Sequence, residues 1–136
     1  MPLSFSETPD HIVIPTRVSL AAYADVLLSH VEDLNLAAGV NQLALAAVPV
    51  GVLHVYTNLV MRYRGTVANV LLSCIIISGG LWYELYAQNP PVSDVRYDRQ
   101  GQWVLAAGDV LMLYISDATA GDDAFLWATG YVVDLT

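Results

Sequence analysis

The feature that most constrains this chain is an alternation of apolar and polar residues with a period of two. It is clearest in VLHVYTNLVMRYRG, residues 52–65. One set of alternate positions is apolar except at Thr57, and the other set carries the polar side chains. Successive side chains of a β-strand point to opposite faces. The segment therefore predicts a strand with a bulge or bend at Thr57–Asn58, whose inward side chains are Leu53, Val55, Leu59, Met61 and Tyr63.

Strand-like segments recur about every 10 to 15 residues, separated by turn residues. The run TVANVLLSCIII ends at Ser78–Gly79–Gly80, LWYELYA follows, and later segments begin at Trp103, Val110 and Ala124. We expect residues 88–102, QNPPVSDVRYDRQGQ, to form a loop because proline cannot donate to a sheet ladder. The spacing predicts an all-β fold, an antiparallel β-sandwich of jelly-roll-like form.

The word LAAG occurs twice, at residues 36–39 and 105–108, each time before an apolar run. Glycine supplies backbone angles that other residues resist, so each copy is interpreted as the entry to a strand. A two-fold repeat would also produce two copies, but we favour a common turn word that arose twice.

The region from Val18 to Leu36 fits either a helix, from its apolar stripe, or two short strands, VSLAAYA and VLLSHVEDLNL. The β-rich remainder favours strands. Pro2, Pro9 and Pro15 prevent a helix before this region. We therefore expect an extended N-terminal arm over residues 1–16 and a single β-sandwich domain over residues 17–136.

The composition limits the partners of this chain. It has 136 residues, 56% of them apolar, and a net charge of −8, with no lysine and five arginines. Such a charge repels nucleic acid and anionic membranes. The uncharged stretches, residues 34–61 and 65–83, are interrupted by polar residues, so we expect no membrane span. The apolar excess predicts burial against another chain, and hence a homo-oligomer, most simply a trimer.

No pattern of reactive residues appears. His11, His30 and His54 share no metal-ligand spacing, and Cys74 lies in an apolar run. There is no G-x-S-x-G nucleophile motif and no glycine-rich phosphate loop. The acidic loop residues do not match a calcium-binding pattern and are interpreted as solvated turns. We expect no metal, no cofactor and no enzymatic activity.

Other residues are candidates for a protein interface. Arginine tolerates partial burial better than lysine, and aromatic side chains are enriched where proteins meet. The apolar segment HIVIP of the N-terminal arm could pair along an exposed strand edge. The predicted interface residues are His11, Ile12, Val13, Ile14, Arg62, Arg64, Trp82, Tyr86, Arg96 and Tyr97.

Three features together resemble small virion-associated β-sandwich proteins of tailed bacteriophages. They are Val48–Pro49–Val50–Gly51 before a strand, Leu105 to Asp109 before a late strand, and Gly130–Tyr131–Val132–Val133 in the last strand. The resemblance covers residues 48–133. It implies a capsid decoration, or cement, protein that binds the phage head as an oligomer. It also implies synthesis in the host cytoplasm, a place on the capsid surface, and a major capsid protein or other virion protein as partner.

Two alternatives remain. The first is a tail- or fibre-associated module that binds a receptor or glycan, which should expose Trp82 or Tyr97 in a groove beside carboxylates. The second is an enzyme or a carrier of a small ligand. A cement protein should instead bury its aromatic residues between copies.

Overall fold

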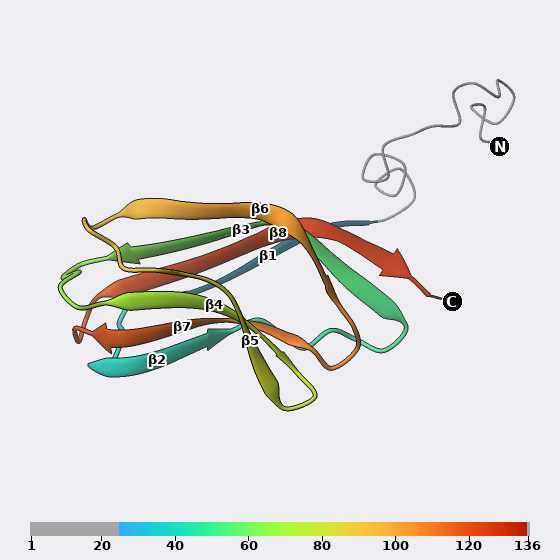
Figure 1. Cartoon of the computed structure of the whole chain (residues 1–136), viewed down its shortest axis with the longest axis horizontal. Helices are drawn as coiled ribbons and strands as arrows, with labels where there is room; N and C mark the ends of the chain where they lie inside the picture. Colours follow the sequence, from blue (N-terminus) through green and yellow to red (C-terminus); the bar gives the residue numbers. More distant parts are fainter. Residues whose placement is uncertain (1–24, 136) are drawn as a thin grey trace, which may run out of the picture.

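The computed structural model describes residues 25–135, which form eight β-strands and no helix (Figure 1). The strands are β1 (Asp25–Asp33), β2 (Gly39–Ala44), β3 (Val52–Arg64), β4 (Leu71–Ser78), β5 (Leu81–Gln88), β6 (Val95–Leu105), β7 (Val110–Ala118) and β8 (Asp123–Asp134). The predicted all-β fold is confirmed.

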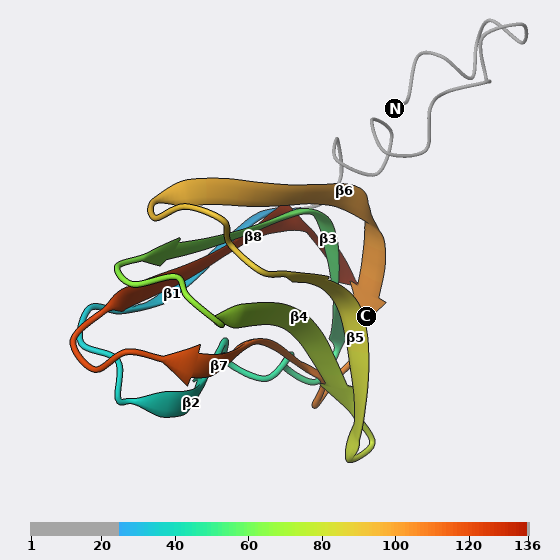
Figure 2. The same ribbon diagram turned by 60° about the vertical axis from the view of Figure 1, so that its left-hand side comes forward.

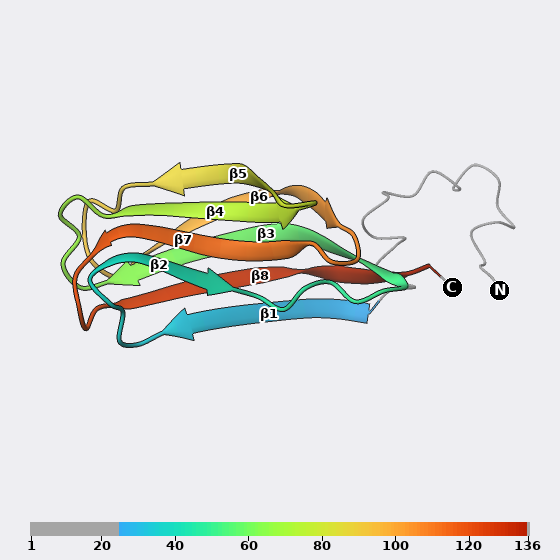
Figure 3. The same ribbon diagram turned by 90° about the horizontal axis from the view of Figure 1, so that it is seen from below.

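The strands form two antiparallel sheets, packed as the two layers of a sandwich (Figures 1 and 3). Sheet A has the order β1-β8-β3-β6, and sheet B has the order β2-β7-β4-β5. Every connection crosses from one sheet to the other except the tight β4–β5 hairpin. This is the strand order of an eight-stranded jelly roll, in which each sheet covers the apolar inner face of the other.

The core lies between the sheets and follows the alternation in the sequence. Sheet A contributes Leu59, Met61 and Tyr63 from β3 and Leu126 from β8. Sheet B contributes Leu72 and Cys74 from β4 together with Leu111, Leu113 and Ile115 from β7.

The predicted bulge in β3 is confirmed, because the pairing of β3 with both neighbours shifts register between Tyr56 and Asn58. The prediction that one set of positions faces inward along the whole strand is wrong. An extra residue reverses which side chains face the core. Tyr56 therefore joins the core with Leu59, whereas Val55 lies on the outer face of sheet A.

The predicted loop over residues 88–102 is too long, because β6 already begins at Val95. The first half of β6 belongs to an edge strand and carries Arg96 and Asp98 on its outer face. It therefore lacks the apolar signal of a central strand. Figure 2 shows β6 bending towards sheet B beyond this half.

For residues 25–33, the helical alternative is wrong and the strand is confirmed. The segment VSLAAYA, the predicted N-terminal arm and the start of the predicted domain at residue 17 lie outside the described residues.

The two LAAG words do lead into strands. Gly39 has φ 91° and begins β2, and Gly108 has φ 87° and precedes β7. Leu36 and Leu105, the first residue of each word, are both buried in the core. Each word therefore anchors a leucine and then uses the glycine to turn the chain into sheet B.

Candidate interaction surfaces

The described part of the chain holds no group of three or more His, Cys, Asp or Glu residues that could bind a metal. The Cys74 side chain is fully buried, and burial raises the pKa of its thiol to about 12, so the thiol stays protonated at neutral pH. His30 lies on the outer face of sheet A, with its Nε2 3.0 Å from Oε1 of Glu32. The His54 side chain points to the other, inner face of sheet A, like that of Tyr56.

The outer face of sheet A carries an aromatic ladder that runs across two neighbouring strands, β1 and β8. The rings of Phe125 and Trp127 stack at 5.4 Å, with 5° between their planes. His30 of β1 stacks on Trp127 at 5.3 Å. Phe125 and Trp127 are two residues apart in β8, so the alternation that sends Leu126 into the core places both rings outside.

Three arginines lie over this ladder. The guanidinium carbons of Arg62 and Arg64 lie 5.1 and 5.3 Å from the centre of the Phe125 ring. That of Arg96 lies 5.6 Å from the centre of the Trp127 ring. A cation over an aromatic face is stabilised by the quadrupole of the ring, and a guanidinium keeps its hydrogen-bond donors free at the edges.

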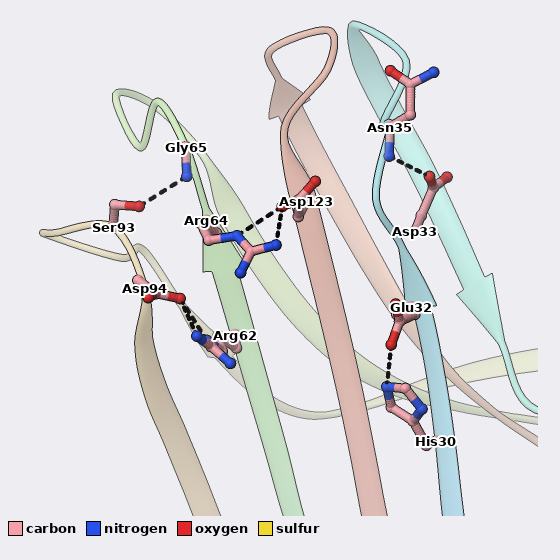
Figure 4. Close-up of polar contacts among 10 residues, drawn as sticks. All are labelled: His30, Glu32, Asp33, Asn35, Arg62, Arg64, Gly65, Ser93, Asp94 and Asp123. Atoms are coloured by element: carbon pink, nitrogen blue, oxygen red, sulfur yellow. Dashed lines mark hydrogen bonds and ion pairs between the residues drawn. The ribbon is translucent and has the colours of Figure 1, made fainter.

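Carboxylates fix two of these arginines, as Figure 4 shows at one end of sheet A. Nε of Arg62 donates to Oδ1 of Asp94 at 2.6 Å, and Nε of Arg64 donates to Oδ2 of Asp123 at 2.7 Å. Within residues 25–135, Arg96 has a ring contact but no carboxylate at ion-pair distance. Arg96 is therefore the arginine of this face best able to bind an outside group.

Apolar side chains extend the face towards both edges of sheet A. Val26 and Leu28 of β1 are 74% and 76% exposed, and Val104 of β6 is also exposed. A hollow of about 280 Å³ lies beside the ladder, lined by Val60, Arg96, Trp127 and Thr129. We call this whole surface the aromatic–arginine face.

Sheet B has a different outer face. The pairing registers place fourteen side chains on it: Val40, Gln42, Ala44, Leu71, Ser73, Ile75, Ile77, Trp82, Glu84, Ala87, Val110, Met112, Tyr114 and Ser116. Glu84 is the only charged residue among them, and Trp82 is 50% exposed. The rings of Trp82 and Tyr114 meet edge to face at 5.8 Å. We call this surface the uncharged face, because Glu84 on the edge strand β5 is its only charged residue.

A hollow of about 340 Å³ opens between the β1 edge and the segment that follows β2. It is lined by Leu28, Ser29, His30, Leu45, Ala46, Ala47, Pro49, His54 and Tyr56. The hydroxyls of Ser29 and Tyr56 are hydrogen-bonded at 3.1 Å. Burial lowers the pKa of His54, which favours the neutral imidazole at neutral pH.

The predicted interface residues are distributed unevenly. Arg62, Arg64 and Arg96 come together on the aromatic–arginine face, and Trp82 lies on the uncharged face. Tyr86 lies inside the sandwich, where its hydroxyl is within 3.2 Å of the carbonyl of Leu59 and 3.1 Å of that of Tyr97. It is therefore a core residue and not the surface residue that the sequence suggested.

Tyr97 also faces inward and packs against the core, with a buried hydroxyl that has no hydrogen-bond partner among the described residues. The predicted contacts of His11, Ile12, Val13 and Ile14 lie outside the described residues. Sequence reasoning missed Phe125 and Trp127. The alternation in FLWATGYVV places both on one face of a strand and could have identified them.

The sequence matches no protein-family model and shows no significant similarity to a curated protein. Residues 25–135 contain no helix of the length and apolarity needed to cross a membrane.

Proposed function

We propose that this chain is a non-enzymatic virion structural protein, a capsid decoration (cement) protein that binds and stabilises the phage head as an oligomer, most simply a trimer. The observation that carries the proposal is that both sheets expose large apolar side chains on their outer faces, in addition to the apolar faces buried between them. These side chains are Val26, Leu28 and Val104 on sheet A and Val40 and Trp82 on sheet B. A small sandwich that acts alone needs only its inner faces to be apolar.

The aromatic–arginine face has the composition of a protein interface. Aromatic residues and arginine are the side chains most enriched at interface centres. Here Trp127 supplies partly exposed aromatic surface with Arg96 over its ring, and Arg62 and Arg64 lie over the buried Phe125 ring. We assign this face to the capsid. The assignment to a virion draws on the resemblance over residues 48–133.

A tail- or fibre-associated module that binds a receptor or glycan is the second candidate. The hollow beside Trp127 favours it, because an aromatic ring can pack against a sugar while Arg96 and the hydroxyl of Thr129 supply polar contacts. The sequence predicts a glycan groove at Trp82 or Tyr97. Tyr97 packs against the core of the sandwich, so it does not line such a groove.

The test is binding of the purified protein to expanded empty capsids of the phage that encodes it. We expect the protein to sediment with these capsids and to raise the temperature at which they disrupt. Trp127→Ala with Arg96→Ala should weaken binding at least tenfold. Asp109→Asn, in the turn before β7, is the matched control on a different surface and should bind normally.

The proposal fails if the wild-type protein neither sediments with capsids nor stabilises them. Retention on immobilised glycans that requires Trp127 would then favour the second candidate.

A further inference from the structure

We infer that the uncharged face of sheet B is the surface through which copies of this chain associate, so that its partner is a second copy. This inference rests on the proposed oligomer and specifies which surface forms it. It leaves the aromatic–arginine face free for the virion partner.

The charge distribution is the first argument. The chain has a net charge of −8, so two copies repel each other at most orientations. The outer face of sheet A carries six charged residues, namely Glu32, Arg62, Arg64, Arg96, Asp98 and Asp123. The outer face of sheet B carries Glu84 alone, although it is formed by four strands. Copies that meet through this face bring the fewest like charges together.

The position of Glu84 is the second argument. It lies on β5, an edge strand of sheet B, and its side chain is exposed. A carboxylate at the rim of an interface can keep its water, whereas one at the centre would have to lose it. The central strands β4 and β7 present no charge on this face.

The shape of the face is the third argument. Trp82 and Tyr114 lie two rows apart, on either side of the row that contains Ile75 and Met112. Their rings meet across that row, and Ile75 and Met112 are buried although they belong to the outer face. The result is a pair of packed aromatic rings on this face, with Trp82 still 50% exposed. Tryptophan and tyrosine of this kind are typical anchors of protein interfaces.

The chemistry of the face selects the partner. A basic protein would be recognised by carboxylates, and this face offers one, at its rim. A glycan would need several hydrogen-bonding groups around the tryptophan. The cross-strand neighbours of Trp82 are Ile77 and Val110, and the polar residues nearest to it on this face are Tyr114, whose ring packs against it, and Glu84 at the rim. An apolar, uncharged surface is best matched by one of the same kind, and a second copy of this chain carries it.

The experiment introduces a charge into the face without disturbing the core. Ala44 on β2 and Ala87 on β5 are small, exposed and placed on the two opposite edge strands of sheet B. One carboxylate at the rim is tolerated, but two more would give each copy three with Glu84, on both sides of the face, so that facing copies repel each other. We expect the wild-type protein to sediment as an oligomer at micromolar concentration, and Ala44→Glu with Ala87→Glu to sediment as a folded monomer. Ala44→Gln with Ala87→Gln has the same size without the charge and should remain oligomeric.

Leu28→Glu places one glutamate on the aromatic–arginine face and should leave the oligomer intact. A wild-type monomer, or a glutamate double variant that keeps the wild-type mass, would overturn the inference. A Leu28→Glu monomer beside an oligomeric double variant would do the same and would place the self-association surface on sheet A. Circular dichroism checks that each variant is folded.

Capsid binding separates this inference from the proposed function. An oligomer that depends on Ala44 and Ala87 but does not bind capsids would keep the inference and reject the function. A wild-type monomer that binds capsids through Trp127 would reject the inference and the proposed oligomer, and would keep the capsid-binding role.

Discussion

The hydroxyl of Tyr63 donates a hydrogen bond to Oδ2 of Asp122 across 2.8 Å, joining the end of β3 to the loop between β7 and β8. The same Oδ2 accepts the N–H of Thr66 at 2.8 Å, and the Tyr63 oxygen accepts the N–H of Thr119 at 3.2 Å. The carbonyl of Asp122 in turn accepts the N–H of Leu36, at the start of the first LAAG word. One buried tyrosine therefore ties three chain segments together at this end of the sandwich.

Tyr63→Phe should lower the free energy of unfolding by about 1–3 kcal/mol, because it leaves the Thr119 N–H without its acceptor and removes a donor from the Asp122 carboxylate. Urea denaturation measures the change. Tyr131→Phe is the matched control, because the Tyr131 hydroxyl is buried with no hydrogen-bond partner among the described residues. Its removal should change stability by less than about 0.5 kcal/mol. Equal losses in the two variants would show that the hydrogen bonds of Tyr63 contribute little.

The protein should lose stability at alkaline pH. Burial raises the pKa of Tyr63 from 10.0 to about 12 and that of Cys74 from 9.0 to about 12, and it also raises the pKa of Tyr86. These groups ionise in the unfolded chain before they ionise in the folded one, so the unfolded state holds fewer protons above pH 9. Their contribution is complete below the unfolded pKa values and is lost as the pH rises towards about 12.

Urea midpoints measured at intervals from about pH 7 to pH 11 check this prediction. The midpoint should be nearly constant at first and then fall at the alkaline end. Tyr63→Phe should show a shallower fall than the wild-type protein. A midpoint that rises over the alkaline range would contradict the sign of the effect.

Gly130→Ala should prevent folding or destabilise the protein by at least about 3 kcal/mol. A Cβ atom at this position would lie 1.8 Å from the backbone carbonyl oxygen of Val55, which cannot move without breaking the β3–β8 pairing. Gly108→Ala is the comparison. It has open space around the added carbon but a φ of 87°, so it should cost only about 1–2 kcal/mol. Thermal unfolding ranks the two, and a larger loss at Gly108 would reverse the argument.

Deletion of residues 1–15 should leave the sandwich folded while weakening assembly or particle binding. The core that the structure describes joins residues from Leu36 to Ala128, and HIVIP is an apolar, strand-like segment suited to pairing with an exposed strand edge. Circular dichroism tests folding, and sedimentation with capsids tests binding. Replacement of residues 11–15 by a Gly/Ser segment of equal length controls for chain length. Unchanged assembly and unchanged binding in both variants would identify the arm as a passive tail.

The sequence by itself determined the strands and their turns. The alternation from Val52 to Arg64, the glycines of the two LAAG words and the shift at Thr57–Asn58 are local signals, because side-chain direction and backbone angle depend on neighbouring residues. The weak edge strand at Val95 escaped detection because an exposed strand carries little apolar signal.

Only the tertiary structure decided which residues share a face. The bulge reversed the orientation of Val55, the β5 ladder directed Tyr86 into the core, and β8 brought Phe125 and Trp127 beneath arginines from β3 and β6. These relationships depend on strand pairing between residues far apart in the chain, and a single shift of register exchanges the inner and outer faces of a strand. The aromatic–arginine face and the uncharged face therefore became visible only when the two sheets were assembled.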